Sequence, residues 1–207
     1  MKIAIIGAGK VGTTLGKNWS SKGHEICYGT RNPKDEKHSV LKEFAEVTTL
    51  KEAASKAEVI VLATPWSTTE AAILEMENTL DGKILIDSTN PFKPDMSGLT
   101  HSGNDSGGEQ VARWAPKAKV VKAINCTFAS VMANPEINGI KATLLIASDD
   151  EDALQQVAML TNDLGFNTQK MKGLANSRLI EMVGLTLVTL AFKEGLGPNF
   201  GFTLLKN

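Results

Sequence analysis

The stretch that decides the fold is Ile3-Ala4-Ile5-Ile6-Gly7-Ala8-Gly9-Lys10-Val11-Gly12. A short apolar run, typical of a strand, leads directly into the pattern G-x-G-x-x-G, which opens a helix-like segment. In this context the first glycine makes a tight turn, the second lets the backbone approach a pyrophosphate, and the third lets helix and strand pack closely. The pyrophosphate would lie on N–H groups at the helix N-terminus. The pattern therefore predicts a dinucleotide site at Gly7, Ala8, Gly9, Lys10, Val11 and Gly12.

The rest of the chain alternates short apolar runs with longer amphipathic ones. Predicted strands are residues 2–6, 25–28, 59–63, 83–86, 119–123, 143–147 and 166–169; predicted helices are 11–21, 34–46, 51–55, 68–80, 108–115, 150–164 and 174–194. The run 59–63 is apolar on both faces, as in a parallel sheet covered by helices on both sides. The alternation predicts an α/β fold, a doubly wound Rossmann domain over residues 1–172. Residues 173–207 would form a short helical extension.

Composition excludes several classes of protein. The 207 residues carry 22 Lys and Arg against 23 Asp and Glu, and this net charge of −1 argues against a protein that coats nucleic acid. No uninterrupted apolar run approaches the ~20 residues of a membrane span, and the N-terminus is too short before its first strand for a signal peptide. Cys27 and Cys126 lie far apart, which indicates a reducing cytoplasm without a disulfide framework. No cluster has metal-ligand spacing, so no metal site is predicted.

The segment after the second strand predicts the choice of nucleotide. An NAD site usually has an acidic residue here to hold the ribose 2′-OH. This chain instead has Thr30, Arg31, Asn32 and Lys34. A carboxylate would repel a 2′-phosphate, whereas a planar guanidinium can pair with it through two hydrogen bonds. We therefore expect NADP(H) rather than NAD(H).

Several motifs together resemble the F420-dependent NADP reductase family, and the NADPH-oxidising domain of the six-transmembrane metalloreductases is similar too. They are Gly7–Gly12, Gly23-His24-Glu25-Ile26, Gly29-Thr30-Arg31-Asn32-Pro33, Thr64-Pro65-Trp66, Val120-Val121-Lys122-Ala123-Ile124-Asn125 and Asn176-Ser177-Arg178-Leu179-Ile180-Glu181. The resemblance spans nearly the whole chain. It implies an NADP(H)-binding Rossmann domain that faces a deazaflavin (F420) or a flavin across a cleft. It also implies a C-terminal part that takes part in a homodimer.

The resemblance assigns roles by position. Residues 8–11 would surround the pyrophosphate, and Thr30 with Arg31 would take the 2′-phosphate. Thr64, Pro65 and Trp66 would border the ribose and nicotinamide, and Ala123 and Asn125 would face the place where the nicotinamide meets its partner. Asn125 stands where the archaeal deazaflavin enzymes carry His, so FMN or FAD is open as the acceptor beside F420.

The carboxyl ends of parallel strands are where open α/β sheets bind ligands, so Asn90 should also lie near the nicotinamide. The long Gly- and Pro-containing loop that follows, residues 91–107, would then cover the cleft. Because hydride transfer leaves the chemistry to the cofactors, no catalytic side chain is predicted. The predicted function is hydride transfer between NADP(H) and a flavin-like small-molecule acceptor. Two alternatives stay open: a reductase of a small carbonyl or imine, with Asp87 or Glu109 as an acid, and a non-catalytic NADPH-binding sensor or partner protein.

Overall fold

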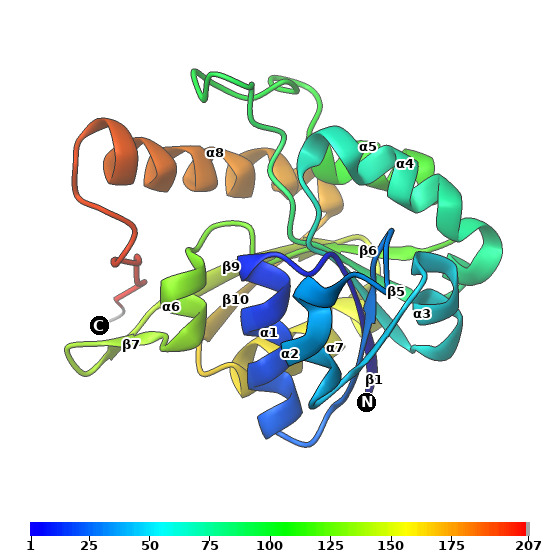
Figure 1. Cartoon of the computed structure of the whole chain (residues 1–207). Coiled ribbons are helices and arrows are strands. Elements are labelled where there is room, and N and C mark those ends of the chain that lie inside the picture. Colours follow the sequence, from blue (N-terminus) through cyan, green and yellow to red (C-terminus); the bar gives the residue numbers. More distant parts are fainter. Residues whose placement is uncertain (206–207) are drawn as a thin grey trace.

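A mostly parallel eight-stranded sheet forms the centre of the protein in a computed structural model, which describes residues 1–205 (Figure 1). The strands lie in the order β10-β9-β6-β5-β4-β1-β2-β3. Their bounds are β1 Lys2–Ile6, β2 Glu25–Gly29, β3 Glu46–Thr48, β4 Val59–Leu62, β5 Ile84–Asp87, β6 Lys119–Lys122, β9 Thr143–Ser148 and β10 Asn167–Lys172. The order from β3 to β6 is that of a doubly wound Rossmann fold, which confirms the predicted fold class.

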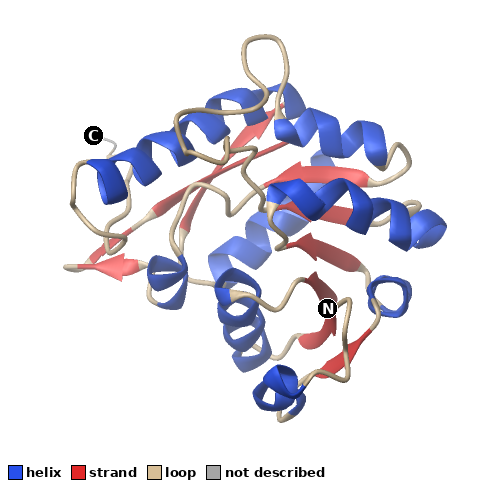
Figure 2. Cartoon of the chain, turned by 45° about the horizontal axis from the view of Figure 1, so that its top comes forward, coloured by secondary structure: helices blue, strands red, loops and turns tan. Residues whose placement is uncertain are grey.

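Helices cover both faces of the sheet (Figure 2). They are α1 Lys10–Ser21, α2 Ser39–Lys42, α3 Leu50–Lys56, α4 Trp66–Met76, α5 Gly107–Trp114, α6 Ala129–Ala133, α7 Glu151–Asp163 and α8 Ser177–Val188. One core cluster packs the sheet against α1, α6 and α7, and includes Ile180 and Leu187 of α8. A second cluster packs the opposite face against α3, α4 and α5. Strands with apolar side chains on both faces, such as β4, are buried between these two layers.

One edge of the sheet departs from the parallel arrangement. Strand β9 runs antiparallel to β6, and β10 then pairs with β9 in parallel. The chain between β6 and β9 contains the five-residue helix α6 and a small hairpin, β7 Glu136–Ile137 with β8 Ile140–Lys141. A parallel return needs a crossover of a dozen or more residues, usually a helix that spans the length of the sheet. Helix α6 is too short to do this, so the next strand starts at the same end at which β6 stops.

The expected helix over residues 34–46 is wrong in its extent. The structure has a 3₁₀ turn, η1 Glu36–His38, and the four-residue helix α2, after which Glu46 begins strand β3. The short strand β3 pairs with β2 over only three positions. Its apolar content is too small to give a strand pattern, because β3 is the edge strand of the sheet and is partly exposed.

The predicted C-terminal helix is present. A 3₁₀ turn, η3 Leu174–Asn176, leads into α8, which ends in a π-helical turn, η4 Thr189–Lys193. By length and composition alone, Leu174–Lys193 could cross a membrane, although polar residues interrupt its apolar sequence. However, Glu181 in its middle is fully buried against a lysine of the sheet, which identifies this face of α8 as a layer over the sheet (Figure 1). The predicted extension includes residues 206–207, which lie outside the described residues.

Candidate functional site

A cavity of about 1040 Å³ lies at the carboxyl ends of β1, β2 and β4. Ten of the predicted site residues line it: Gly7, Ala8, Gly9, Lys10, Val11, Thr30, Arg31, Asn32, Thr64 and Pro65. Ser88, which follows β5, lines its far end. The cavity thus follows the path that a dinucleotide takes in this fold, from the end of β2 across the glycine loop to the ends of β4 and β5.

The glycine loop has the geometry that the sequence predicted. Gly7 has a φ of +112°, and a Cβ there would lie 2.5 Å from the carbonyl oxygen of Ala63. Gly12 does not line the cavity but packs against the loop itself, where a Cβ would overlap the carbonyl of Gly7. Gly9 caps α1, and a Cβ on Gly9 would meet no atom within 4 Å. Within residues 1–205, no side chain caps the first turn of α1 and no acidic residue lies in it, so no side chain competes with a ligand for its N–H groups.

The end of β2 provides polar and cationic groups to one end of the cavity. Thr30 is buried, and its Oγ1 finds no hydrogen-bond partner among the described residues. A buried hydroxyl without a partner is costly and points to a group that arrives from outside. The exposed side chain of Arg31 lies next to it. Lys34 does not line the cavity, whereas Lys37 and His38 do, because η1 turns the chain back toward the cavity at residue 36.

A pair of amides joins the carboxyl ends of β5 and β6. The Asn90 side chain donates to the backbone carbonyl of Asn125 at 2.8 Å, and the Asn125 side chain donates to Asn90 Oδ1 at 3.0 Å. Asn125 Oδ1 is buried and has no partner within residues 1–205. Ile124, just before it, has a φ of +64°, which is uncommon for a β-branched residue. Neither asparagine lines the cavity, although Ser88 lies only two residues before Asn90.

Two further predicted site residues lie outside the cavity. Ala123 is fully buried in the core cluster that packs the sheet against α1, α6 and α7. Trp66 packs against Trp114, with ring centroids 5.3 Å apart, and against His101, at 5.6 Å. These rings join the start of α4 to the end of α5 and to the loop after β5, which rises above the top of the molecule in Figure 1. Trp66 therefore holds this loop in place rather than bordering the cavity.

A buried ion cluster is the polar feature that sequence reasoning missed. Lys122 Nζ donates to Asp87 Oδ2 and Glu181 Oε1, both at 2.9 Å, and all three side chains are completely buried. Burial disfavours the charged lysine, but attraction by the two carboxylates is stronger and raises the pKa of Lys122 above its usual value. Asp87 and Lys122 are directly paired across β5 and β6. In the sequence, the sign of this cluster is a pair of opposite charges, each at the last position of an apolar strand, on two strands that lie side by side in the sheet.

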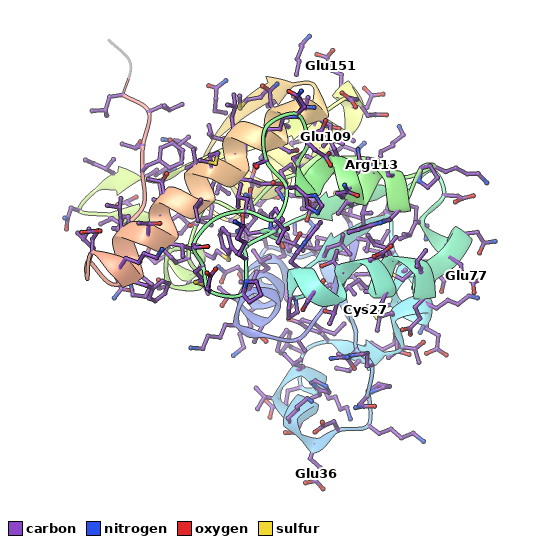
Figure 3. The ribbon with its side chains drawn as sticks, turned by 90° about the horizontal axis from the view of Figure 1, so that it is seen from above. Cys27, Glu36, Glu77, Glu109, Arg113 and Glu151 are labelled. Atoms are coloured by element: carbon purple, nitrogen blue, oxygen red, sulfur yellow. The ribbon has the colours of Figure 1, made fainter. Side chains whose placement is uncertain are left out.

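The acids considered for a carbonyl or imine reductase have internal partners. Asp87 belongs to the ion cluster, and Glu109 of α5 receives two hydrogen bonds from Arg178, at 2.9 and 2.6 Å. The hydrogen bonds from Arg178 lower the pKa of Glu109. Figure 3 shows Glu109 on α5 beside the loop and α8. Neither acid lines the cavity.

No metal centre is evident in the part of the chain that the structure describes, since no three His, Cys, Asp or Glu side chains there could share an ion. Cys27 and Cys126 are both buried free thiols. Burial, with a smaller effect of Glu46, raises the pKa of Cys27 to about 11. The cavity therefore depends on backbone N–H groups, hydroxyls and cations.

Comparisons of the sequence and of the structure with known proteins point to the same protein family. The family model described as "NADP oxidoreductase coenzyme F420-dependent" matches residues 2–91. The F420-dependent NADP reductase of Methanothermobacter marburgensis is 31% identical, with 94% of each chain covered. Metalloreductase STEAP3 of Rattus norvegicus is 30% identical over 90% of this chain, which spans 37% of that protein.

Solved structures extend this likeness to the whole fold. A crystal structure of a proposed F420-dependent NADP reductase from Arthrobacter sp. FB24 has a TM-score of 0.91, with 31% identity and complete coverage of both chains. An imine reductase from Aspergillus terreus, with a TM-score of 0.70, 16% identity and coverage of 91% of this chain and 60% of that chain, shares the fold. From these matches, over nearly its full length, the chain belongs to the F420-dependent NADP reductase family, a family of NADP-dependent oxidoreductases.

Proposed function

We propose that this protein transfers hydride between NADP(H), bound in the cavity, and a flavin-like or deazaflavin acceptor. When bound, NADPH supplies the hydride from its nicotinamide ring. The observation that carries the proposal is the end of β2, where the buried Thr30 hydroxyl, which has no hydrogen-bond partner among residues 1–205, lies next to Arg31 in the same cavity as the glycine loop. A hydroxyl and a guanidinium suit a 2′-phosphate, and a planar guanidinium can hold it through two hydrogen bonds.

The chain's own residues would hold the dinucleotide at three places. The N–H groups of residues 8–11 would bind the pyrophosphate at the start of α1, where the helix dipole favours negative charge. Thr30, Arg31, Asn32 and Lys37 would bind the adenosine end with its 2′-phosphate. Thr64 and Pro65 would border the ribose of the nicotinamide half.

A fourth contact is the amide pair. Asn125 Oδ1 is a buried acceptor to which no group of the described residues donates, and a nicotinamide carboxamide carries an N–H₂ group of the matching kind. Asn90 fixes the orientation of Asn125 because its side chain donates to the Asn125 backbone carbonyl and accepts from the Asn125 side-chain amide. These residues would orient the ring toward the acceptor, and hydride transfer is highly sensitive to such alignment.

The alternative of a carbonyl or imine reductase is less well supported. Such a reaction needs a proton donor near the reacting atom. Asp87 and Glu109, the acids considered for this role, are bound to Lys122 and Arg178 and do not line the cavity. Hydride transfer to a flavin-like ring needs no protein acid, and it therefore fits the observed side chains better.

We further propose that the protein acts as a homodimer in the cytoplasm. The outer face of α8 and the turn after it expose four large apolar side chains, Leu179, Met182, Phe192 and Leu196. Groups of exposed apolar side chains often mark interfaces, and a second copy is the commonest partner. The two buried free thiols suit a reducing compartment.

Anaerobic oxidation of NADPH with FMN, FAD, riboflavin and a deazaflavin tests the proposed function. We expect rapid oxidation with at least one of these acceptors and much slower oxidation of NADH. Tight binding of NADPH without turnover by any acceptor would favour the sensor alternative.

A further inference from the structure

We propose that the ion cluster of Asp87, Lys122 and Glu181 is a positioning device that holds α8 against the Asn90–Asn125 amide pair. Through this contact the C-terminal helix would set the geometry of the nicotinamide end of the site. The inference rests on the proposed function, because it concerns residues assigned there to the nicotinamide. It makes Lys122 and Glu181 positioning residues, since neither lines the cavity.

Every polar group of the cluster is paired. Lys122 Nζ donates to both carboxylates and to the Thr89 carbonyl at 2.7 Å. Asp87 Oδ1 also accepts from the backbone N–H and the hydroxyl of Thr89, at 2.9 and 2.6 Å. The N–H groups of Gly107 and Gly108 donate to the two oxygens of Glu181, each at 3.0 Å. The cluster thus joins the ends of β5 and β6, the start of α5 and the middle of α8.

Stability alone does not account for such a cluster. Burial of three charges is expensive, and apolar residues of similar volume often stabilise a protein as well or better. Loss of one partner, in contrast, leaves an uncompensated buried charge. The arrangement therefore strongly disfavours any shift or rotation of α8 that would separate Glu181 from Lys122. It fixes one position of the helix on the sheet.

That position places Gly184 of α8 directly on the amide pair. Gly184 follows Glu181 by one helical turn, and a Cβ there would lie 2.9 Å from Asn90 Oδ1 and 3.3 Å from the carbonyl oxygen of Asn125. The other half of the cluster holds the turn before Asn90, because both Asp87 and Lys122 bind Thr89. The same ions therefore position the amide pair from the strand side and from the helix side.

A second ion pair between the same helices provides a matched control. Glu109 and Arg178 also join α5 to α8, but they are partly exposed and bind no residue of β5, β6 or the amide pair. Loss of this pair should loosen the helix contact without moving Gly184 from Asn90. The variants to compare are Glu181→Gln, Gly184→Ala and Glu109→Gln.

The experiment compares the Kd of NADPH with that of 2′-phospho-ADP-ribose, which lacks the nicotinamide. In the wild type we expect NADPH to bind about five- to tenfold more tightly, as one additional hydrogen bond to a buried acceptor allows. The quantity compared is the Kd of 2′-phospho-ADP-ribose divided by the Kd of NADPH. In Glu181→Gln and Gly184→Ala this ratio should fall to within about twofold of one, while 2′-phospho-ADP-ribose keeps its wild-type affinity. Glu109→Gln should retain the wild-type ratio.

If Glu181→Gln does not fold, Gly184→Ala still tests the contact through which the ions would act, because it changes the packing of α8 on the amide pair and leaves the ions intact. The inference would be overturned if both variants kept the Kd ratio of the wild type. It would also be overturned if Glu109→Gln lowered the ratio as much as they do, or if the ratio of the wild type itself were already near one. The assay needs no acceptor. Failure of every acceptor to oxidise NADPH would therefore count against the proposed function, separately from this result.

Discussion

Asn90 and Asn125 bond each other across the ends of two neighbouring strands, with amide hydrogen bonds of 2.8 and 3.0 Å in opposite directions. In Asn125→Ala, Asn90 Oδ1 loses its donor and the unpaired acceptor at Asn125 disappears. One acceptor of the pair lacks a donor before the change and one after it, so we expect only a small change in melting temperature. Turnover of NADPH should fall more than tenfold, while 2′-phospho-ADP-ribose binds as before. A variant with wild-type turnover would remove Asn125 from the site.

Cofactor choice is the second prediction. Arg31→Ala removes the guanidinium beside the buried Thr30 hydroxyl at the end of the cavity. A hydrogen bond to a charged group contributes about 1.5–3 kcal/mol, so NADPH should bind about ten- to a hundredfold more weakly, and NADH should change little.

Titration of both nucleotides by fluorescence checks this prediction. Lys22→Ala is the control for loss of a positive charge, because Lys22 is exposed at the other end of α1. Equal weakening of NADPH and NADH in Arg31→Ala would show that Arg31 does not read the 2′-phosphate.

The glycine loop and the alternation of strands and helices could be predicted from the sequence because both depend on local patterns. Gly7 needs a positive φ, and Gly12 needs the absence of a Cβ, whatever the rest of the chain does. The strand from Val59 to Leu62 shows its burial in its composition. These features require no knowledge of distant residues.

Contacts between distant residues could not be predicted in this way. The replacement of Lys34 by Lys37 at the cavity depends on the turn at residue 36, and the position of Trp66 depends on Trp114 and His101. The pairing of Lys122 with Glu181 joins residues 59 positions apart. Sequence periodicity describes one element at a time, so it places Asp87 at a strand end without identifying its partner.

Assembly is the third prediction. Met182 is about half exposed on the outer face of α8, so Met182→Lys should fold normally but separate the subunits. Light scattering should give twice the chain mass of 22.2 kDa for the wild type and the single mass for this variant. Leu74→Lys, which changes an exposed leucine on α4, should remain a dimer. A monomeric wild type at micromolar concentration would contradict the proposal, as would a fully stable truncation that ends near residue 172.

Thiol reactivity provides the fourth prediction and its pH dependence. The pKa of Cys27 is raised to about 11, mainly by burial, and burial also raises the pKa of Cys126. At pH 8 only about one Cys27 in a thousand would be a thiolate, which is the reactive form. Iodoacetamide should therefore label the folded protein very slowly at pH 8 and faster as the pH rises toward 11. In guanidinium chloride both of the two cysteines should react readily. Rapid labelling of the folded protein at pH 8 would show that a thiol is accessible and activated.

Transfer of deuterium from NADPH to the acceptor tests the central claim most directly. NADPH labelled at one of the two C4 positions of the nicotinamide is incubated anaerobically with the protein and a deazaflavin, whose C5 retains a transferred deuterium. A site that holds the nicotinamide in one orientation should transfer the label from only one of the two labelled forms, and mass spectrometry of the reduced acceptor should show it there. Partial transfer from both forms, or oxidation of NADPH without deuterium in the acceptor, would contradict direct hydride transfer in this cleft.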